Sequence, residues 1–160
     1  MYISKYWGNY IGGTDDSLNL LDYLADKNKT EISLSEVFVD LGLDQLAGSF
    51  IQTSVPLEFV HSDGVCTDFH FAIDLITDLS AILLECKKSD GINLRKLNKH
   101  NMPDRVIRIS ATPEEYALVN QVLEHFASNP LEYDLSELVP EEDMLEMAEV
   151  CERLRQELEQ

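Results

Sequence analysis

The first part of the chain places apolar residues at helical spacing behind two polar capping segments. Thr14-Asp15-Asp16-Ser17 offers side-chain oxygens for a helix start, and apolar residues follow it at helical spacing. Lys27 and Lys29 place cations where the C-terminal end of that helix is expected. Ser33-Leu34-Ser35-Glu36 is a capping box, and Gly42 ends the short apolar run behind it. These signals predict two helices, one on each side of residue 30.

The most apolar stretch of the chain runs from Phe69 to Cys86. A period of two fits its start and helical spacing fits the rest, while Lys87-Lys88-Ser89-Asp90-Gly91 is typical of a helix end. We therefore predict a buried helix over residues 71–88 at the centre of the fold. Asp74 and Asp78 lie one helical turn apart within it, and we expect them to mark its more hydrated stripe.

The remaining pattern predicts a mixture of strands and helices. Asp134-Leu135-Ser136-Glu137 repeats the capping pattern of residues 33–36 and predicts a further helix start. The other predicted elements are a hairpin with strands at 57–60 and 65–69, a strand at 105–110, a helix from Thr112 to Ala127, and an amphipathic helix from Pro140 to about Glu159. The chain of 160 residues is expected to form a single domain over residues 1–160. Its predicted class is α+β, predominantly helical with a small antiparallel sheet.

The charge of the chain narrows the kind of partner. Twelve Lys and Arg against 30 Asp and Glu give a net charge of -18. Such a surface repels nucleic acid and anionic membranes, so we expect no direct binding to either, and it attracts basic partners. The basic stretch, residues 86–108, carries seven basic and two acidic side chains, whereas the acidic tail, residues 130–160, carries two basic and eleven acidic ones. We expect the basic stretch to be a solvated loop that pairs with the acidic tail.

No catalytic, metal or cofactor constellation is recognisable. Gly12-Gly13-Thr14 lacks the lysine and the spacing of a phosphate-binding loop, and no two of the four histidines are four residues apart. The three cysteines form no Cys-x-x-Cys motif and are expected to be buried and reduced. Cys66 and His70 would stand roughly 13 Å apart along a strand, too far for a nucleophile and its base. The sequence therefore indicates a binding protein without cofactor or metal, not an enzyme.

The location of the protein is predicted from what the chain lacks. No apolar run approaches eighteen residues, and residues 1–8 lack the charged start and apolar stretch of a secretory signal. We expect a cytoplasmic protein.

Three segments resemble a family of bacterial immunity proteins: Asn9-Tyr10-Ile11-Gly12-Gly13-Thr14-Asp15-Asp16-Ser17-Leu18, Phe71-Ala72-Ile73-Asp74-Leu75-Ile76-Thr77-Asp78-Leu79 with Leu83-Leu84-Glu85-Cys86, and Pro140-Glu141-Glu142-Asp143-Met144-Leu145-Glu146-Met147-Ala148. In contact-dependent growth inhibition and related polymorphic toxin systems, these proteins are the cognate inhibitors of the toxins. The chain looks closest to those paired with EndoU-like nucleases, which cut RNA. The resemblance implies that it binds the C-terminal nuclease domain of a cognate toxin. The alternative is an acidic cytosolic adaptor or chaperone-like protein without a toxin partner.

Clustered carboxylates at exposed positions are the candidate contacts with a basic toxin surface. The resemblance transfers no interface residue, so the candidates come from charge and predicted exposure alone. Each has an alternative role in helix capping or solubility. They are Asp15 and Asp16 at one helix start, Asp63 in the hairpin turn, and Glu141, Glu142, Asp143 and Glu146 at another helix start.

Overall fold

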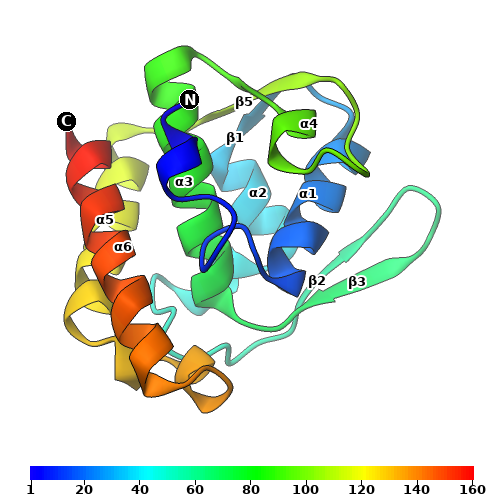
Figure 1. Cartoon of the computed structure of the whole chain (residues 1–160). Helices are drawn as coiled ribbons and strands as arrows, with labels where there is room; N and C mark the ends of the chain where they lie inside the picture. Colours follow the sequence, from blue (N-terminus) through cyan, green and yellow to red (C-terminus); the bar gives the residue numbers. More distant parts are fainter.

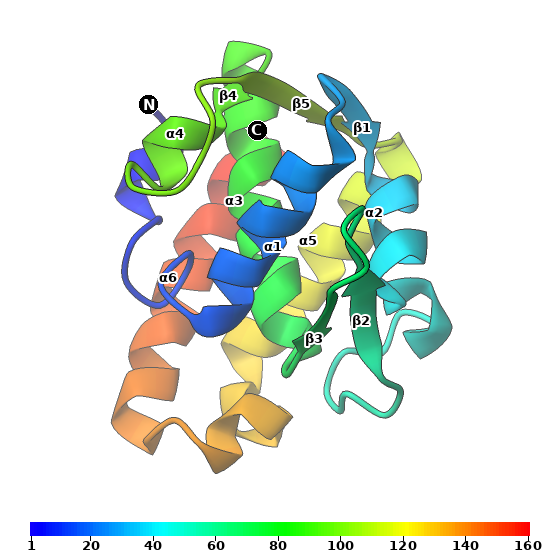
Figure 2. The same cartoon turned by 90° about the vertical axis from the view of Figure 1, so that its right-hand side faces the viewer.

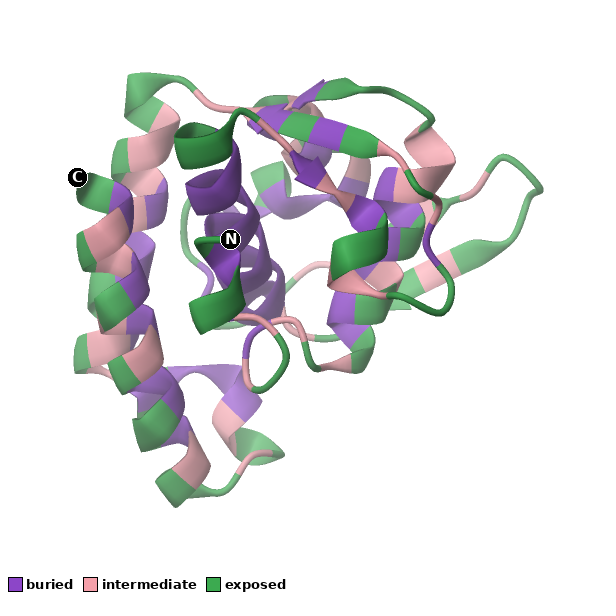
Figure 3. Ribbon diagram, turned by 45° about the horizontal axis from the view of Figure 1, so that its top comes forward, coloured by how far each residue is buried: buried purple, intermediate pink, exposed green.

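A buried helix runs through the middle of the molecule. The computed structural model describes all 160 residues, and its helix α3 (Ala72–Ser89) has every residue from Ala72 to Cys86 buried. Figure 3 shows this burial along nearly the whole helix, in contrast to the striped surface helices. A helix that is enclosed on all sides must be covered by several other elements. The predicted central helix over residues 71–88 is confirmed.

Helices cover α3 from different sides (Figure 1). α1 (Asp15–Lys27) lies on one side, and the antiparallel pair α5 (Pro113–Ser128) and α6 (Glu141–Glu159) lies on the other. The shorter helical segments are α2 (Leu34–Leu41), α4 (Leu94–Leu97) and the 3-10 turns η1 (Ile3–Lys5), η2 (Leu43–Leu46), η3 (Pro130–Glu132) and η4 (Asp134–Glu137). A single cluster of 43 buried hydrophobic residues forms the core between them. The predicted α+β class, mostly helical, is confirmed.

Two small sheets complete the fold (Figure 2). β2 (Leu57–Val60) and β3 (Cys66–Phe69) form the predicted antiparallel hairpin. The other sheet has the order β1-β5-β4, in which β4 (Ile92–Asn93) pairs antiparallel with β5 (Val106–Ser110). β1 (Glu31–Ser33) pairs with β5 in parallel, so this sheet is mixed rather than purely antiparallel.

The capping signals of the sequence set most helix starts. Thr14 and Ser17 form a reciprocal capping box at α1, and Thr112 and Glu115 form another at α5. At α2 only half of the box forms: Ser33 accepts from the Glu36 N–H, while the Glu36 carboxylate pairs with lysines instead. The structure thus reproduces the predicted starts of all three helices.

Asp134 does not cap a helix as predicted. Residues 134–137 form the 3-10 turn η4, and no side chain caps it. The Asp134 carboxylate instead accepts the Thr53 N–H, 2.9 Å away, from a segment far earlier in the chain. A long-range partner has replaced the local hydrogen bond that the sequence pattern offered.

No helix of the structure combines the length and the apolar character needed to span a membrane.

Candidate functional site

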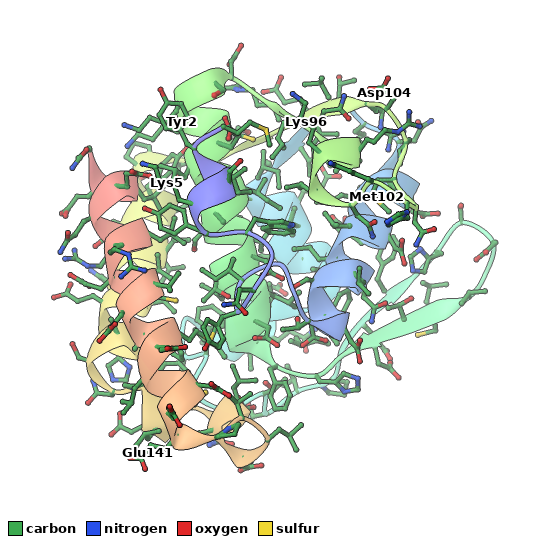
Figure 4. The ribbon with its side chains drawn as sticks, in the orientation of Figure 1. Tyr2, Lys5, Lys96, Met102, Asp104 and Glu141 are labelled. Carbon is green, nitrogen blue, oxygen red and sulfur yellow. The ribbon has the colours of Figure 1, made fainter.

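Most of the predicted contact residues lie at the end of the molecule where α1 and α6 begin. Tyr10, just ahead of α1, donates a hydrogen bond to Glu146 and lies 3.4 Å from Asp143, so the two helix starts are linked directly. The Asp143 side chain is half-buried, and the candidates exposed to solvent at this end are Asp15, Glu141, Glu142 and Glu146. We call these four residues with Asp143 the acidic face. Figure 4 places Glu141 at the lower end of the view.

Asp63 lies apart from the acidic face. It is exposed in the turn between β2 and β3, where its side chain accepts the Val65 N–H. The hairpin projects on the side of the molecule opposite to α6 (Figure 1). The structure therefore does not bring Asp63 together with the other six candidates.

Asp16 is buried, contrary to the expected exposure. Only 2% of its surface is accessible, and its two oxygens accept the N–H groups of His70 and Phe71, each at 2.9 Å. Phe71 is the N-cap residue of α3, which has no cap from its own side chain. Asp16 anchors the residues that lead into α3 to α1, while the Thr53 hydroxyl accepts the N–H of Ala72, the first residue of the helix. Burial raises the pKa of Asp16, and the two N–H donors oppose that shift.

Asp74 and Asp78 do not form a hydrated stripe. They are 3% and 1% exposed, because the N-terminal segment and α1 cover the face of α3 that carries them. Asp78 accepts hydrogen bonds from the Gly12 N–H (2.8 Å) and the Ser17 hydroxyl (2.6 Å). Burial nevertheless raises the pKa of Asp78 to about 7.

The Asp74 carboxyl group lacks comparable hydrogen bonds. Its Oδ1 is buried and makes no hydrogen bond. Burial raises the pKa of Asp74 to about 8, with further contributions from the charges of Asp78, Asp16 and Asp134, and a side-chain hydrogen bond with Thr14 opposes the shift. A buried carboxyl group without a donor at one oxygen favours its protonated form, so Asp74 is largely neutral at pH 7.

Asp74 also lines a pocket between α1, α3 and the segment that leads into α6. The pocket has a volume of about 390 Å³. Carboxyl groups occupy part of its wall, and apolar side chains occupy another part. The lining residues are Thr14, Asp15, Asp16, His70, Phe71, Asp74, Leu135, Leu138 and Val139. The pocket thus adjoins the acidic face and combines both kinds of surface.

The cysteines offer no activated nucleophile. Cys86 and Cys151 are buried as expected, but Cys66 is exposed on β3. Desolvation and the neighbouring carboxylates of Glu58 and Asp68 raise the pKa of the Cys66 thiol, which disfavours the reactive thiolate. The ligand atoms of Glu58, Cys66 and Asp68 lie within 4.8 Å of one another, close enough to share a metal ion, but all three residues are exposed.

The basic stretch does not pair with carboxylates of the acidic tail. Arg105 donates to the Ala25 carbonyl at the end of α1, and Arg108 pairs with Glu31 and Asp90. Its hydrogen bond to the tail runs from Lys87 to the Leu158 carbonyl. The charges of the basic stretch are therefore not balanced by the acidic tail. The partners of its arginines lie at the end of α1, on β1 and after the last turn of α3.

Comparison with known proteins decides the class. Residues 2–158 match the family described as Immunity protein 68. The chain belongs to this immunity protein family. The family match confirms the predicted class of toxin-neutralising immunity protein, and it disfavours the adaptor alternative. No curated protein and no solved structure matches the chain.

Proposed function

We propose that this immunity protein neutralises the nuclease domain of its cognate toxin by forming a stoichiometric, non-covalent complex in the cytoplasm. The family match carries the proposal, because members of an immunity family act on a toxin. We further propose an RNA-cutting toxin of the EndoU type, which rests on the resemblance of the segments 9–18, 71–79 with 83–86, and 140–148. No catalytic step by the immunity protein is required.

The charge of the protein supports a nuclease as partner. A domain that binds RNA presents cationic side chains to the phosphates. A protein with a net charge of -18 is complementary to such a surface. Complementary charge accelerates association and disfavours partners of the same sign.

The acidic face is the proposed main contact region. All of its carboxylates except that of Glu146 come from the first turns of two helices, whose N-terminal dipoles favour negative charge. Asp16 acts from beneath this face by fixing the start of α3 to α1. Asp63, on the separate hairpin, is proposed only as a second contact region.

The decisive experiment uses the C-terminal domain of the toxin encoded beside the gene for this protein. We expect the two purified proteins to form a one-to-one complex. The RNA cleavage activity of the toxin domain should fall in proportion to the amount of immunity protein added. Cells that express the immunity protein should survive the toxin. Failure of the two proteins to associate would refute the proposed function. Inhibition of a toxin that does not cleave RNA would refute only the nuclease assignment.

A further inference from the structure

We infer that the pocket lined by Asp74 receives an arginine side chain of the partner, whose guanidinium pairs with the Asp74 carboxylate. The inference rests on the proposed function for the identity of the partner as the cognate toxin. The chemistry of the pocket itself, however, can be tested without the toxin.

Asp74 lacks a donor at one of its carboxyl oxygens. Asp16 receives two N–H donors and Asp78 receives an N–H and a hydroxyl, whereas Oδ1 of Asp74 receives none. Asp74 is 97% buried and still forms part of the pocket wall. A buried polar atom without a partner is costly, and native proteins keep few of them. Oδ1 itself is closed to solvent, so a donor that enters the pocket would satisfy it after the carboxyl group turns toward the pocket.

The side chains around the pocket carry negative charge. Asp15 and Asp16 line the same pocket as Asp74, so an anionic group would be repelled. The starts of α1 and α3 contribute partial positive charges of roughly half a unit each. The carboxylates at this wall outweigh these partial charges. The pocket therefore favours a cation.

The wall of the pocket favours arginine over lysine. The apolar part of the wall, formed by Phe71, Leu135, Leu138 and Val139, suits an aliphatic stem. The guanidinium is planar and more weakly hydrated than an ammonium group, so it loses less on entering a partly buried site. The volume of about 390 Å³ exceeds that of any single side chain, so the pocket has room for an arginine side chain.

The rim of the pocket has the character of an interface centre. Leu138 is 75% exposed, although it is a large apolar residue at the edge of a polar surface. Energetically important contacts in protein interfaces lie where a charged anchor is enclosed by apolar groups that exclude water. Leu138 is positioned to supply such an enclosure once the partner is bound.

Binding of the guanidinium to Asp74 should depend on pH, because it is linked to the release of a proton. In the free protein the pKa of Asp74 is about 8, so at pH 7 an entering guanidinium displaces a proton. Affinity for the cation should therefore rise between about pH 6 and pH 8, by up to about tenfold per pH unit. The other titratable groups around Asp74 are Asp15 and Asp16 of α1, His70, Asp78 of α3, Asp134 of η4 and Cys151 of α6.

The pocket is tested first with Nα-acetyl-arginine methylamide, titrated into the full ¹⁵N-labelled protein at pH 8. We expect amide shifts confined to the residues that line the pocket, with an affinity on the order of millimolar. The norleucine analogue, which has no guanidinium, should cause none. Asp74→Asn should weaken binding at least tenfold, whereas Asp78→Asn, a matched change of a buried carboxyl group outside the pocket, should not. Shifts elsewhere, or equal binding to Asp74→Asn, would overturn the inference.

The second arm uses the toxin domain and separates the two proposals. We expect Asp74→Asn and Leu138→Ser to weaken toxin binding at least tenfold and several-fold, respectively, with Asp78→Asn close to wild type. Leu138→Ser alters an exposed side chain, so it keeps the test valid if a buried substitution fails to fold. Calorimetry in buffers of different ionisation enthalpy should detect proton release at pH 7 with the wild type and with Asp78→Asn, but not with Asp74→Asn. If the wild type binds the toxin and all variants bind equally, the inference fails while the proposed function stands. If the wild type does not bind the toxin, the proposed function fails, and the arginine titration alone decides the chemistry of the pocket.

Discussion

Asp16, Asp74 and Asp78 are all buried, but each carboxyl group meets different donors. Asp16 accepts two backbone N–H groups, and Asp78 accepts one N–H and one hydroxyl. Asp74 has one oxygen without any donor. These differences decide whether each residue stabilises the fold or destabilises it as the pH changes.

The raised pKa values of Asp74 and Asp78 predict a protein that is more stable in mild acid than in base. Both groups have a pKa near 4 in an unfolded chain, against about 8 and about 7 in the fold. The stability that they contribute is fully present below about pH 4 and is lost as the pH rises through about 7 to 8. We expect the free energy of unfolding at about pH 8 to be lower than at about pH 5 by more than about 1 kcal/mol, measured by urea denaturation.

Two comparisons isolate this effect. Asp26, Glu36 and Glu152 have lowered pKa values, first because of hydrogen bonds from Ser62, Lys27 and Arg155, and their contribution is lost only as the pH falls through the acid range. The double variant Asp74→Asn/Asp78→Asn should flatten the pH dependence between about pH 5 and pH 8. An unchanged slope in this variant would show that other groups cause the dependence.

Neighbouring aspartates at the start of α1 are predicted to differ sharply in their effect on stability. Asp16→Ala removes the acceptor of two N–H groups at the start of α3, and we expect it to lower the free energy of unfolding by about 2 kcal/mol or more. Asp15 is exposed and accepts no such bond, so Asp15→Ala should cost less than about 1 kcal/mol. Thermal denaturation of both variants measures the difference. Equal melting temperatures would show that the two hydrogen bonds accepted by Asp16 contribute little to stability.

At the scale of elements, α3 determines whether the core forms. Leu83 is completely buried in the middle of this helix. Leu83→Asp introduces an unpaired charge there, and we expect a loss of about 4 kcal/mol or more in the free energy of unfolding. Leu145→Asp is the matched control, because Leu145 is 48% exposed near the start of α6. If the Leu83→Asp variant had the same melting temperature as the wild type, α3 would not be the central helix of the core.

The sequence predicted those elements whose signals are local. The starts of α1, α2 and α5 follow from hydrogen-bonding side chains three residues apart, and the end of α2 follows from Gly42. The hairpin β2–β3 was predictable because its strands are joined by a short turn. Interactions between residues that are close in the chain can be predicted from the residue types and their spacing.

Elements that depend on distant partners were not predictable in this way. β1 is only three residues long and exists by pairing with β5, some 77 positions later. Asp74 and Asp78 were expected to be hydrated because nothing near them in the sequence indicates that the N-terminal segment covers them. The acidic clusters of the candidate site were visible in the sequence, but the pocket between them required the fold.

At the scale of the whole molecule, charge is distributed unevenly. Lys96 of the basic stretch and Glu141 of the acidic face lie toward opposite ends of the molecule (Figure 4). The arginines Arg105 and Arg108 are engaged locally, so the basic stretch leaves the carboxylates of the acidic face unpaired. A molecule with this asymmetry should orient its acidic face toward a cationic partner before contact.

Salt dependence of the association rate tests this orientation. Exposed charges are screened beyond about 8 Å at physiological ionic strength and beyond about 3 Å at 1 M salt. We therefore expect salt to slow association with the toxin domain by roughly tenfold or more while changing dissociation less, as measured by stopped-flow kinetics.

Glu141→Lys/Glu142→Lys should slow association strongly at low salt, and Asp15→Lys should do so to a smaller extent. Asp104→Lys/Glu114→Lys changes the net charge by the same amount as the Glu141/Glu142 double variant and should have a much weaker effect. Both residues are exposed, Asp104 lies at the upper end of the view in Figure 4, and Glu114 lies in the first turn of α5, which begins at the end of the molecule opposite to the start of α6 (Figure 1). If the association rate is independent of salt, or if both double variants slow it equally, the acidic face does not steer the encounter, and the apolar rim at Leu138 or the aromatic N-terminal segment becomes the surface to test.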